Sequence, residues 1–265
     1  MGATVTARVL AILAAFSADR PELTLTEVSR RAGLPLTTTH RIVGELAAWG
    51  ALERVGGRYR IGLRLWEVGA LAPRGLGLRE SAMPFLEDLY EVTRQNVQLA
   101  VLDGTDVVYL ERISSRRAVN VISRVGGRLP LHATAVGLVL LAHADPALQE
   151  EVLAGPLRRF TAKTRCDPSE VRRALAEVRR SGVAVTDGQI ELISLSVAAP
   201  VRDATGRVVA ALSVVVPSEG TDSRAYVPAV RAAARGVSRV LGAPDRLRSP
   251  EAERTGHHPA RVLAR

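Results

Sequence analysis

Short polar and basic side chains occupy one stretch in the first quarter of the chain, where an apolar pattern of helical spacing begins. The stretch consists of Thr37, Thr38, Thr39, His40 and Arg41. Threonine hydroxyls can hydrogen-bond to phosphates or base edges, and an arginine can donate two parallel hydrogen bonds to a guanine or a phosphate. The plainer interpretation is that the threonines cap a helix and that the arginine is solvated. The elements that hold the stretch decide between the two.

Two helices are predicted ahead of this stretch. Apolar residues at helical spacing from Val5 to Phe16 predict a first amphipathic helix. Thr26 is the expected N-cap of a short second helix, Glu27 to Ala32, and Gly33 can end it. Both predicted helices therefore come before the polar stretch in the chain.

A third helix and a hairpin complete the unit. The third helix begins near Pro35 and ends at Gly50. Two alternating runs follow, Leu52–Val55 and Arg58–Ile61, and the Gly56-Gly57 pair between them is typical of a hairpin turn. The whole order is that of a winged helix-turn-helix, in which the second motif helix directs its N-terminal residues into the major groove of DNA. We therefore interpret the polar stretch as a DNA contact, supported by three arginines of the wing: Arg54, Arg58 and Arg60.

Breaks in composition divide the chain. Pro73-Arg74-Gly75 interrupts one helical pattern, and Gly242-Ala243-Pro244 stops the last one. The expected segments are a winged helix-turn-helix domain (residues 4–64), a linker helix and hinge (65–77), a second domain (78–242) and a disordered tail (243–265). The apolar run Leu63–Leu71, which contains Trp66, is expected to pair with a second copy of the chain; burial within one chain is the alternative.

Strands and helices alternate irregularly in the second domain. Strands are predicted over Asn96–Leu102, Val107–Arg112, Val119–Arg124, Val183–Thr186, Leu195–Pro200 and Val208–Val216. Helices are predicted over residues 133–142, 168–182 and 226–241. Adjacent strands joined by hairpins, with helices between groups of strands, indicate an α+β sheet domain rather than a doubly wound one.

Four ordered segments resemble one family of proteins. The first is LTLTEVSRRAGLPLTTTHRIVGELAAWGALERVGGRYRIGLRLWEVG, and it is followed by GGRLPLHATAVGLVLLA, FTAKTRCDP and LSVAAPVRDATGRVVAALSVVVP. Together they are similar to the IclR family of bacterial transcription regulators, over about residues 4–242. The resemblance implies a dimeric or tetrameric regulator whose second domain is a GAF-like α/β unit that binds a small metabolite, often a carboxylic acid. It also implies the effector-binding residues: Ala135, Val136, Asp187, Ser194, Ser196, Ser213 and Val215.

Composition narrows the class of protein further. The net charge is +9, from 36 basic and 27 acidic side chains, and this permits DNA binding without establishing it. A single cysteine, Cys166, excludes an internal disulfide framework and a cysteine-rich zinc site. No stretch reaches the roughly 18 apolar residues of a membrane span, and the start lacks a signal sequence. We expect a soluble cytoplasmic protein.

The sequence offers no catalytic machinery. It lacks a phosphate-binding GxxxxGK[ST] loop and a GxSxG nucleophile motif, and its histidines do not cluster like metal ligands. No cofactor and no metal are expected. The interpretation is a sequence-specific DNA-binding regulator, a repressor, whose affinity for a double-stranded operator changes when a small carboxylate binds. The alternative is a small-molecule-binding module or enzyme that uses its winged helix for protein contacts.

Overall fold

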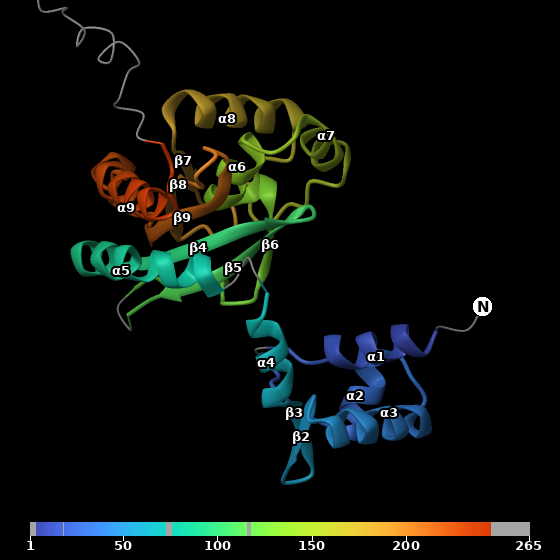
Figure 1. The fold of residues 1–265 in the computed structure, drawn as a ribbon. Helices are drawn as coiled ribbons and strands as arrows, with labels where there is room; N and C mark the ends of the chain where they lie inside the picture. The colour runs from blue at the N-terminus through green and yellow to red at the C-terminus, as the bar shows by residue number, and fades with distance from the viewer. Residues whose placement is uncertain (1–3, 18, 73–75, 116–117, 245–265) are drawn as a thin grey trace, which may run out of the picture. The chain divides into compact units, whose positions relative to one another are not determined.

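The computed structural model describes residues 4–17, 19–72, 76–115 and 118–244. The chain separates into two compact units, with the division between residues 76 and 77 (Figure 1). The predicted tail falls mostly on residues 245–265, and these lie outside the described residues, as do the proposed boundary residues 73–75. Within the described segments, no helix has the length and apolar character needed to cross a membrane.

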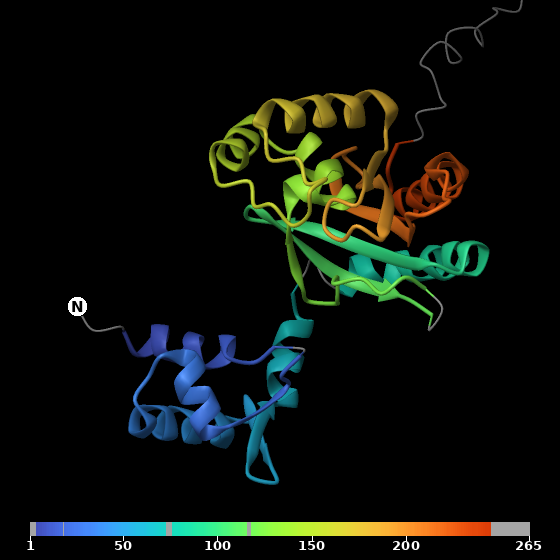
Figure 2. The same ribbon diagram turned by 180° about the vertical axis from the view of Figure 1, so that it is seen from behind.

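The first unit is the predicted winged helix-turn-helix. Its elements are α1 (Val5–Ala14), β1 (Glu22–Thr24), α2 (Leu25–Ala32), α3 (Leu36–Trp49), β2 (Leu52–Val55), β3 (Arg58–Ile61) and α4 (Leu63–Ala70). The strands form an antiparallel sheet in the order β1-β3-β2, and the β2–β3 hairpin extends away from the helices (Figure 2). Strand β1, only three residues long, was not expected from the sequence. The core joins α1, α2 and α3 to this sheet through Ile12, Val28, Ile42 and Tyr59.

The start of α2 corrects one expectation. The N-cap is Thr24 and not Thr26, because only Thr24 has a glutamate three residues later. The Thr24 hydroxyl accepts from the Glu27 N–H at 3.3 Å, and the Glu27 carboxylate accepts from the Thr24 N–H at 2.8 Å. The Glu27 carboxylate also accepts from the Thr24 hydroxyl at 2.9 Å, and the two bonds that it accepts from Thr24 hold the pKa of Glu27 below its usual range. The predicted end is confirmed: Gly33 adopts the left-handed conformation, with φ of 65°.

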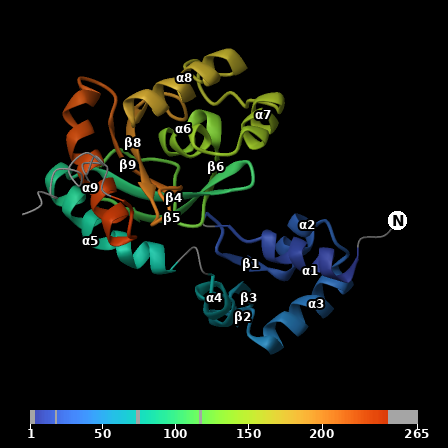
Figure 3. The same ribbon diagram turned by 45° about the horizontal axis from the view of Figure 1, so that its top comes forward.

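The second unit is a six-stranded antiparallel sheet covered by helices on both faces. Its helices are α5 (Leu76–Thr93), α6 (Ala135–Ala142), α7 (Pro146–Ala154), α8 (Pro168–Ser181) and α9 (Val227–Val240). Its strands are β4 (Asn96–Asp103), β5 (Asp106–Ile113), β6 (Arg128–Pro130), β7 (Ala184–Asp187), β8 (Ser194–Arg202) and β9 (Val208–Pro217), in the spatial order β6-β5-β4-β9-β8-β7. Helices α6, α7 and α8 lie on one face, and α5 and α9 lie side by side on the other (Figures 1 and 3). This confirms the α+β prediction.

Successive side chains of a strand point to opposite faces of the sheet, so the same strands contribute to a hydrophobic core on each face. On β9, Ala211 belongs to the core beneath α6 and α8, whereas Leu212 belongs to the core beneath α5 and α9. Packing on the second face is close, since a Cβ atom on Gly236 of α9 would approach the ring of Phe85 of α5 to 2.4 Å. Helices α5 and α7 were not predicted from the sequence.

The strand predicted over residues 119–124 is absent from the described structure, where this segment is irregular. Side chains from the neighbouring strands take up its backbone groups. The Asn96 amide donates to the Val119 carbonyl at 2.7 Å, and the Arg112 guanidinium donates to the Ser123 carbonyl at 2.9 Å. The segment is thus held as a loop against the sheet, and the strand next to β5 is β6.

Candidate functional site

The N-terminal turns of α3 present most of the predicted polar stretch to solvent. Thr37, His40 and Arg41 are exposed, and Thr38 is half-buried. The Arg41 guanidinium donates to the Glu45 carboxylate one turn later, at 2.6 Å. An exposed pair of this kind contributes little stability, so a stronger anion can replace Glu45 as the partner of Arg41.

Thr39 does not belong to this exposed set. Its side chain is fully buried, and its hydroxyl donates to the Pro35 carbonyl at 3.0 Å. Thr39 shares the inward face of α3 with Ile42 and Val43. The prediction that it contacts DNA is therefore wrong, because helical periodicity turns it toward the domain core.

The three wing arginines lie on different faces of the hairpin. Because side chains alternate along a strand and Arg54 is opposite Tyr59, Arg54 shares the face of Tyr59, which is buried against the helices. Arg58 and Arg60 lie on the other face. Arg58 is 3.6 Å from Glu27, and Arg60 is 2.8 Å from Glu53.

Arg54 differs in its partners. Its guanidinium lies 5.9 Å from the centre of the Tyr59 ring and has no carboxylate partner among the described residues. Of the three wing arginines, Arg54 is therefore the one whose charge is not paired with a carboxylate of the described residues.

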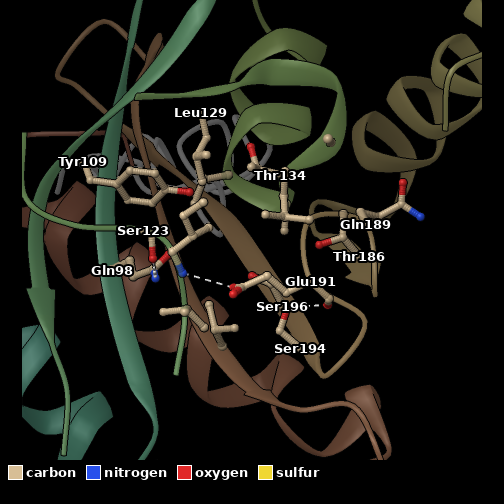
Figure 4. A pocket seen from close by; sticks show the side chains of 17 residues that line it. Gln98, Tyr109, Ser123, Leu129, Thr134, Thr186, Gln189, Glu191, Ser194 and Ser196 are labelled. Atoms are coloured by element: carbon tan, nitrogen blue, oxygen red, sulfur yellow. Dashed lines mark hydrogen bonds between the residues drawn. The ribbon is translucent and has the colours of Figure 1, made fainter. Parts of the chain in front are cut away.

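In the second unit a pocket opens between the N-terminus of α6, the strands β4, β5, β8 and β9, and the loops around residues 121–123 and 189–191 (Figure 4). Five of the seven predicted effector residues line it: Ala135, Val136, Ser194, Ser196 and Val215. Its cavity volume is about 40 Å³, which is room for no more than a few water molecules. The pocket therefore holds little empty space.

The first turn of α6 offers an anion-binding geometry at this pocket. The Thr134 hydroxyl caps the helix by accepting from the Gly137 N–H at 3.0 Å, and it donates to the Pro130 carbonyl at 3.2 Å. The N–H groups of Ala135 and Val136 precede the first intrahelical bond, so they have no acceptor within the helix. Gly137 makes this tight entry possible, since a Cβ atom there would lie 2.4 Å from the Leu131 carbonyl oxygen.

Two predicted effector residues lie outside the lining. Asp187 is 2.7 Å from the Lys163 ammonium and also accepts a hydrogen bond from Ser218, and these two bonds lower its pKa. Ser213 is fully buried, and its hydroxyl donates to the Gln98 side chain at 3.4 Å. Ser213 does share a sheet face with the pocket, but Gln98 is the residue that reaches the lining.

Several polar lining residues escaped the sequence analysis, and Tyr109 of β5 is the most informative. Its ring extends into the pocket (Figure 4), and burial raises the pKa of its phenol. Within the described structure its hydroxyl has no hydrogen-bond partner, unlike the neighbouring Gln98 amide, which donates to the Ser123 hydroxyl at 2.5 Å. Tyr109 is thus a neutral hydroxyl that a ligand can engage. A buried aromatic in a predicted strand is the ordinary pattern of a core residue, so the sequence carries no signal that could have identified Tyr109.

The two loops that line the pocket are joined by a hydrogen bond. The Glu191 carboxylate accepts from the Ile122 N–H at 3.1 Å (Figure 4). Glu191 is also the only charged residue among the described residues that line the pocket, which include no Arg, Lys or His. A bound carboxylate would thus rely on N–H and hydroxyl donors.

The FTAKTR segment, residues 160–165, holds one of the pocket's loops in place through hydrogen bonds. The Thr164 hydroxyl donates to the Gln189 carbonyl at 2.6 Å, and the Gln189 side chain bonds the Arg165 N–H and the Lys163 carbonyl in return. The Thr161 hydroxyl donates to the Gly188 carbonyl at 2.5 Å. These bonds hold the loop that carries Glu191, so this motif acts on the pocket without lining it.

Neither a metal centre nor a catalytic histidine emerges from the described part of the chain. No three His, Cys, Asp or Glu side chains there are placed to hold a metal ion. His132 is buried, its Nε2 is 3.0 Å from the Arg158 carbonyl oxygen, and burial lowers its pKa. His132 therefore packs and hydrogen-bonds.

Comparison with known proteins agrees with both units. Residues 5–56 match the IclR helix-turn-helix domain, and residues 72–239 match the bacterial transcriptional regulator IclR C-terminal domain. The chain is 33% identical over 243 residues to the HTH-type transcriptional regulator XynR of Escherichia coli, covering 89% of this chain and 96% of that protein. It is 32% identical over 213 residues to the Pca regulon regulatory protein of Pseudomonas putida, covering 80% of this chain and 73% of that protein.

A solved structure resembles the whole described chain. It is the crystal structure of an IclR homolog of Microbacterium hydrocarbonoxydans complexed with 4-hydroxybenzoate. That homolog is 42% identical, with a TM-score of 0.86, over 90% of this chain and 99% of its own. With a winged helix-turn-helix, a two-faced sheet domain and matches over both, this chain belongs to the IclR family of bacterial transcriptional regulators.

Proposed function

We propose that the protein is a homo-oligomeric repressor that acts in the cytoplasm and releases its operator when a hydroxylated aromatic carboxylate binds in the pocket at α6. The carrying observation is the polarity of that pocket. The free N–H groups of Ala135 and Val136 suit a carboxylate, and the unpartnered Tyr109 hydroxyl suits a second polar group on the ligand. Val136 and Val215 supply apolar contacts between them. The 4-hydroxybenzoate bound to a homolog has this combination of groups.

Binding of such a ligand requires the pocket to open. An aromatic acid does not fit a cavity of about 40 Å³, since small-molecule sites usually enclose about 300 Å³ or more. The Ile122–Glu191 hydrogen bond joins the two loops that line the pocket, and we infer that these loops separate when a ligand enters. The ligand then stabilises the opened state, and this difference in affinity is what can shift the assembly away from DNA binding.

A mobility-shift titration tests the proposal. The protein should retard its own upstream DNA, and 4-hydroxybenzoate should release it. Benzoate should release it less effectively, and 4-hydroxybenzyl alcohol, which lacks the carboxylate, should have no effect. Retardation that no aromatic acid alters would refute the proposed ligand class. Failure to bind upstream DNA at all would favour the alternative of a metabolite-binding module with a winged helix used for protein contacts.

DNA contact is proposed through Thr37, Thr38, His40 and Arg41 of α3 and through the wing. Replacing Arg41 with alanine should relax base preference and cost about 1–3 kcal/mol if the side chain reads a base. Replacing Arg54 with alanine should weaken binding to all sequences alike and reduce the salt slope by about one unit. Arg58→Ala is the matched comparison, with a smaller effect, because its guanidinium is already paired with Glu27. Salt-titrated mobility shifts measure all three, and equal slopes for Arg54→Ala and wild type would contradict the wing assignment.

The role of Tyr109 is tested by removing its hydroxyl alone. Tyr109→Phe should weaken 4-hydroxybenzoate binding by about tenfold, since a ligand hydroxyl loses its partner in a buried site. Benzoate has no hydroxyl at that position, so its affinity should change little. Isothermal titration of both acids against both proteins gives the comparison. A parallel loss for the two acids would mean that Tyr109 only shapes the pocket.

A further inference from the structure

A second cavity, separate from the effector pocket, lies on the opposite face of the sheet of the second unit. It is bounded by the C-terminal half of α9, the end of β8, and residues 243–244, and its volume is about 590 Å³. Its lining shares no residue with the effector pocket, although β8 contributes to both. The floor is apolar and includes Ala199 and Ala234, which belong to the core beneath α9.

Four arginines surround this floor: Arg202, Arg231, Arg235 and Arg239. Three of them recur every fourth residue along one side of α9. The described lining contains no aspartate or glutamate. Four like charges around one recess repel each other, and they are stabilised together when a multiply charged anion lies between them.

Two of the four guanidinium groups are held in place. Arg202 donates to the Gly206 carbonyl at 2.8 Å and is 3.2 Å from the His143 ring nitrogen, and Arg231 donates to the Ser181 carbonyl. A carbonyl partner orients Arg231 without neutralising its charge. Arg235 and Arg239 have exposed side chains and no hydrogen-bond or ion-pair partner among the described residues. The cavity thus combines preset arginines with uncommitted ones.

We propose that this arginine cavity binds a small phosphorylated molecule carrying at least two negative charges. The planar fork of arginine matches phosphate oxygens in pairs, and phosphate esters keep their charge at neutral pH. The apolar floor accommodates the organic part of such a molecule. The recess favours a small ligand over a nucleic-acid backbone, because the four arginines line a single cavity of about 590 Å³.

Pyrophosphate and inorganic phosphate are suitable probes, titrated calorimetrically into the full-length protein at constant ionic strength. Pyrophosphate should bind saturably and more tightly than phosphate. The double variant Arg235→Ser/Arg239→Ser should lose at least about tenfold in affinity, since it lacks two charge-assisted hydrogen-bond donors. The matched control is Arg173→Ser/Arg224→Ser, which removes the same charge from exposed positions outside the cavity and should bind as wild type does.

Every other outcome overturns the proposal. Absence of saturable pyrophosphate binding, or equal losses in the two double variants, would mean that only overall charge attracts the anion. Loss of operator affinity in Arg235→Ser/Arg239→Ser without pyrophosphate binding would identify a DNA-backbone surface instead. A change in oligomeric state would identify a contact between copies. The titration uses neither operator nor aromatic acid, so its result is independent of the effector assignment.

Discussion

Replacing Trp66 with glutamate is expected to convert the protein to a monomer and to weaken operator binding by about a hundredfold or more, because two linked DNA contacts become independent. Helix α4 has no buried residue in the described chain. Trp66 is 66% exposed, and Leu63, one turn earlier on the same side of α4, is 62% exposed; Leu71, which caps the helix, is 80% exposed. Exposed apolar side chains of this kind mark an interaction surface, and a second copy of the chain is the proposed partner.

The Trp66→Glu variant should leave the fold of the first unit intact, because Trp66 is exposed and α4 has no buried residue in the described chain. The start of α4 is anchored elsewhere, by Arg64, which lies 4.4 Å from the centre of the Trp49 ring and donates to the Trp49 carbonyl at 3.1 Å. Val68→Glu is the control, since Val68 is also exposed but lies on the opposite side of the helix from Trp66. Light scattering and mobility shifts provide the measurements. A dimeric Trp66→Glu variant, or equal dissociation of Val68→Glu, would contradict the pairing.

Replacing Ser196 with leucine is expected to abolish the response to the effector while operator affinity stays the same. Ser196 lines a cavity of only about 40 Å³, and the leucine side chain would occupy the space the ligand needs. The DNA-binding unit has its own separate core, so the substitution does not reach it. We expect at least about a hundredfold loss of effector affinity, because the ligand would have to displace a packed side chain.

Ser213→Ala is the informative comparison. Ser213 lies on the same face of the sheet, beside Gln98 on the neighbouring strand, and it is outside the lining. Removing its hydroxyl should lower the free energy of unfolding slightly and leave the effector response normal. Titration calorimetry with the effector and denaturant unfolding separate the two effects. If Ser196→Leu folds and still responds, or if Ser213→Ala is the variant that fails to respond, the pocket has been assigned to the wrong residues.

Local chemistry was sufficient to predict most of the elements near these sites. Gly56 and Gly57 have φ of 56° and 79°, as a two-residue hairpin turn requires, and β2 and β3 have the predicted bounds. Asp167 caps α8 through the Ser169 N–H, and Gly182 ends that helix. The strand predicted over residues 119–124 did not form, because side chains of β4 and β5 hydrogen-bond the backbone carbonyls of this segment.

The sequence by itself determined the family and the winged helix-turn-helix, because turn residues, caps and ordered motifs are local signals, and the resemblance to the family placed the proposed effector pocket at the start of α6. Only the tertiary structure decided which side chains meet there. Ser213 and Gln98 are 115 residues apart, and their pairing across β4 and β9 excludes one from the pocket and admits the other. Likewise, Arg54 lacks the carboxylate partners that Arg58 and Arg60 have, because strand register sets the face on which each arginine lies. Contacts between distant residues depend on register and packing, and neither leaves a local pattern in the sequence.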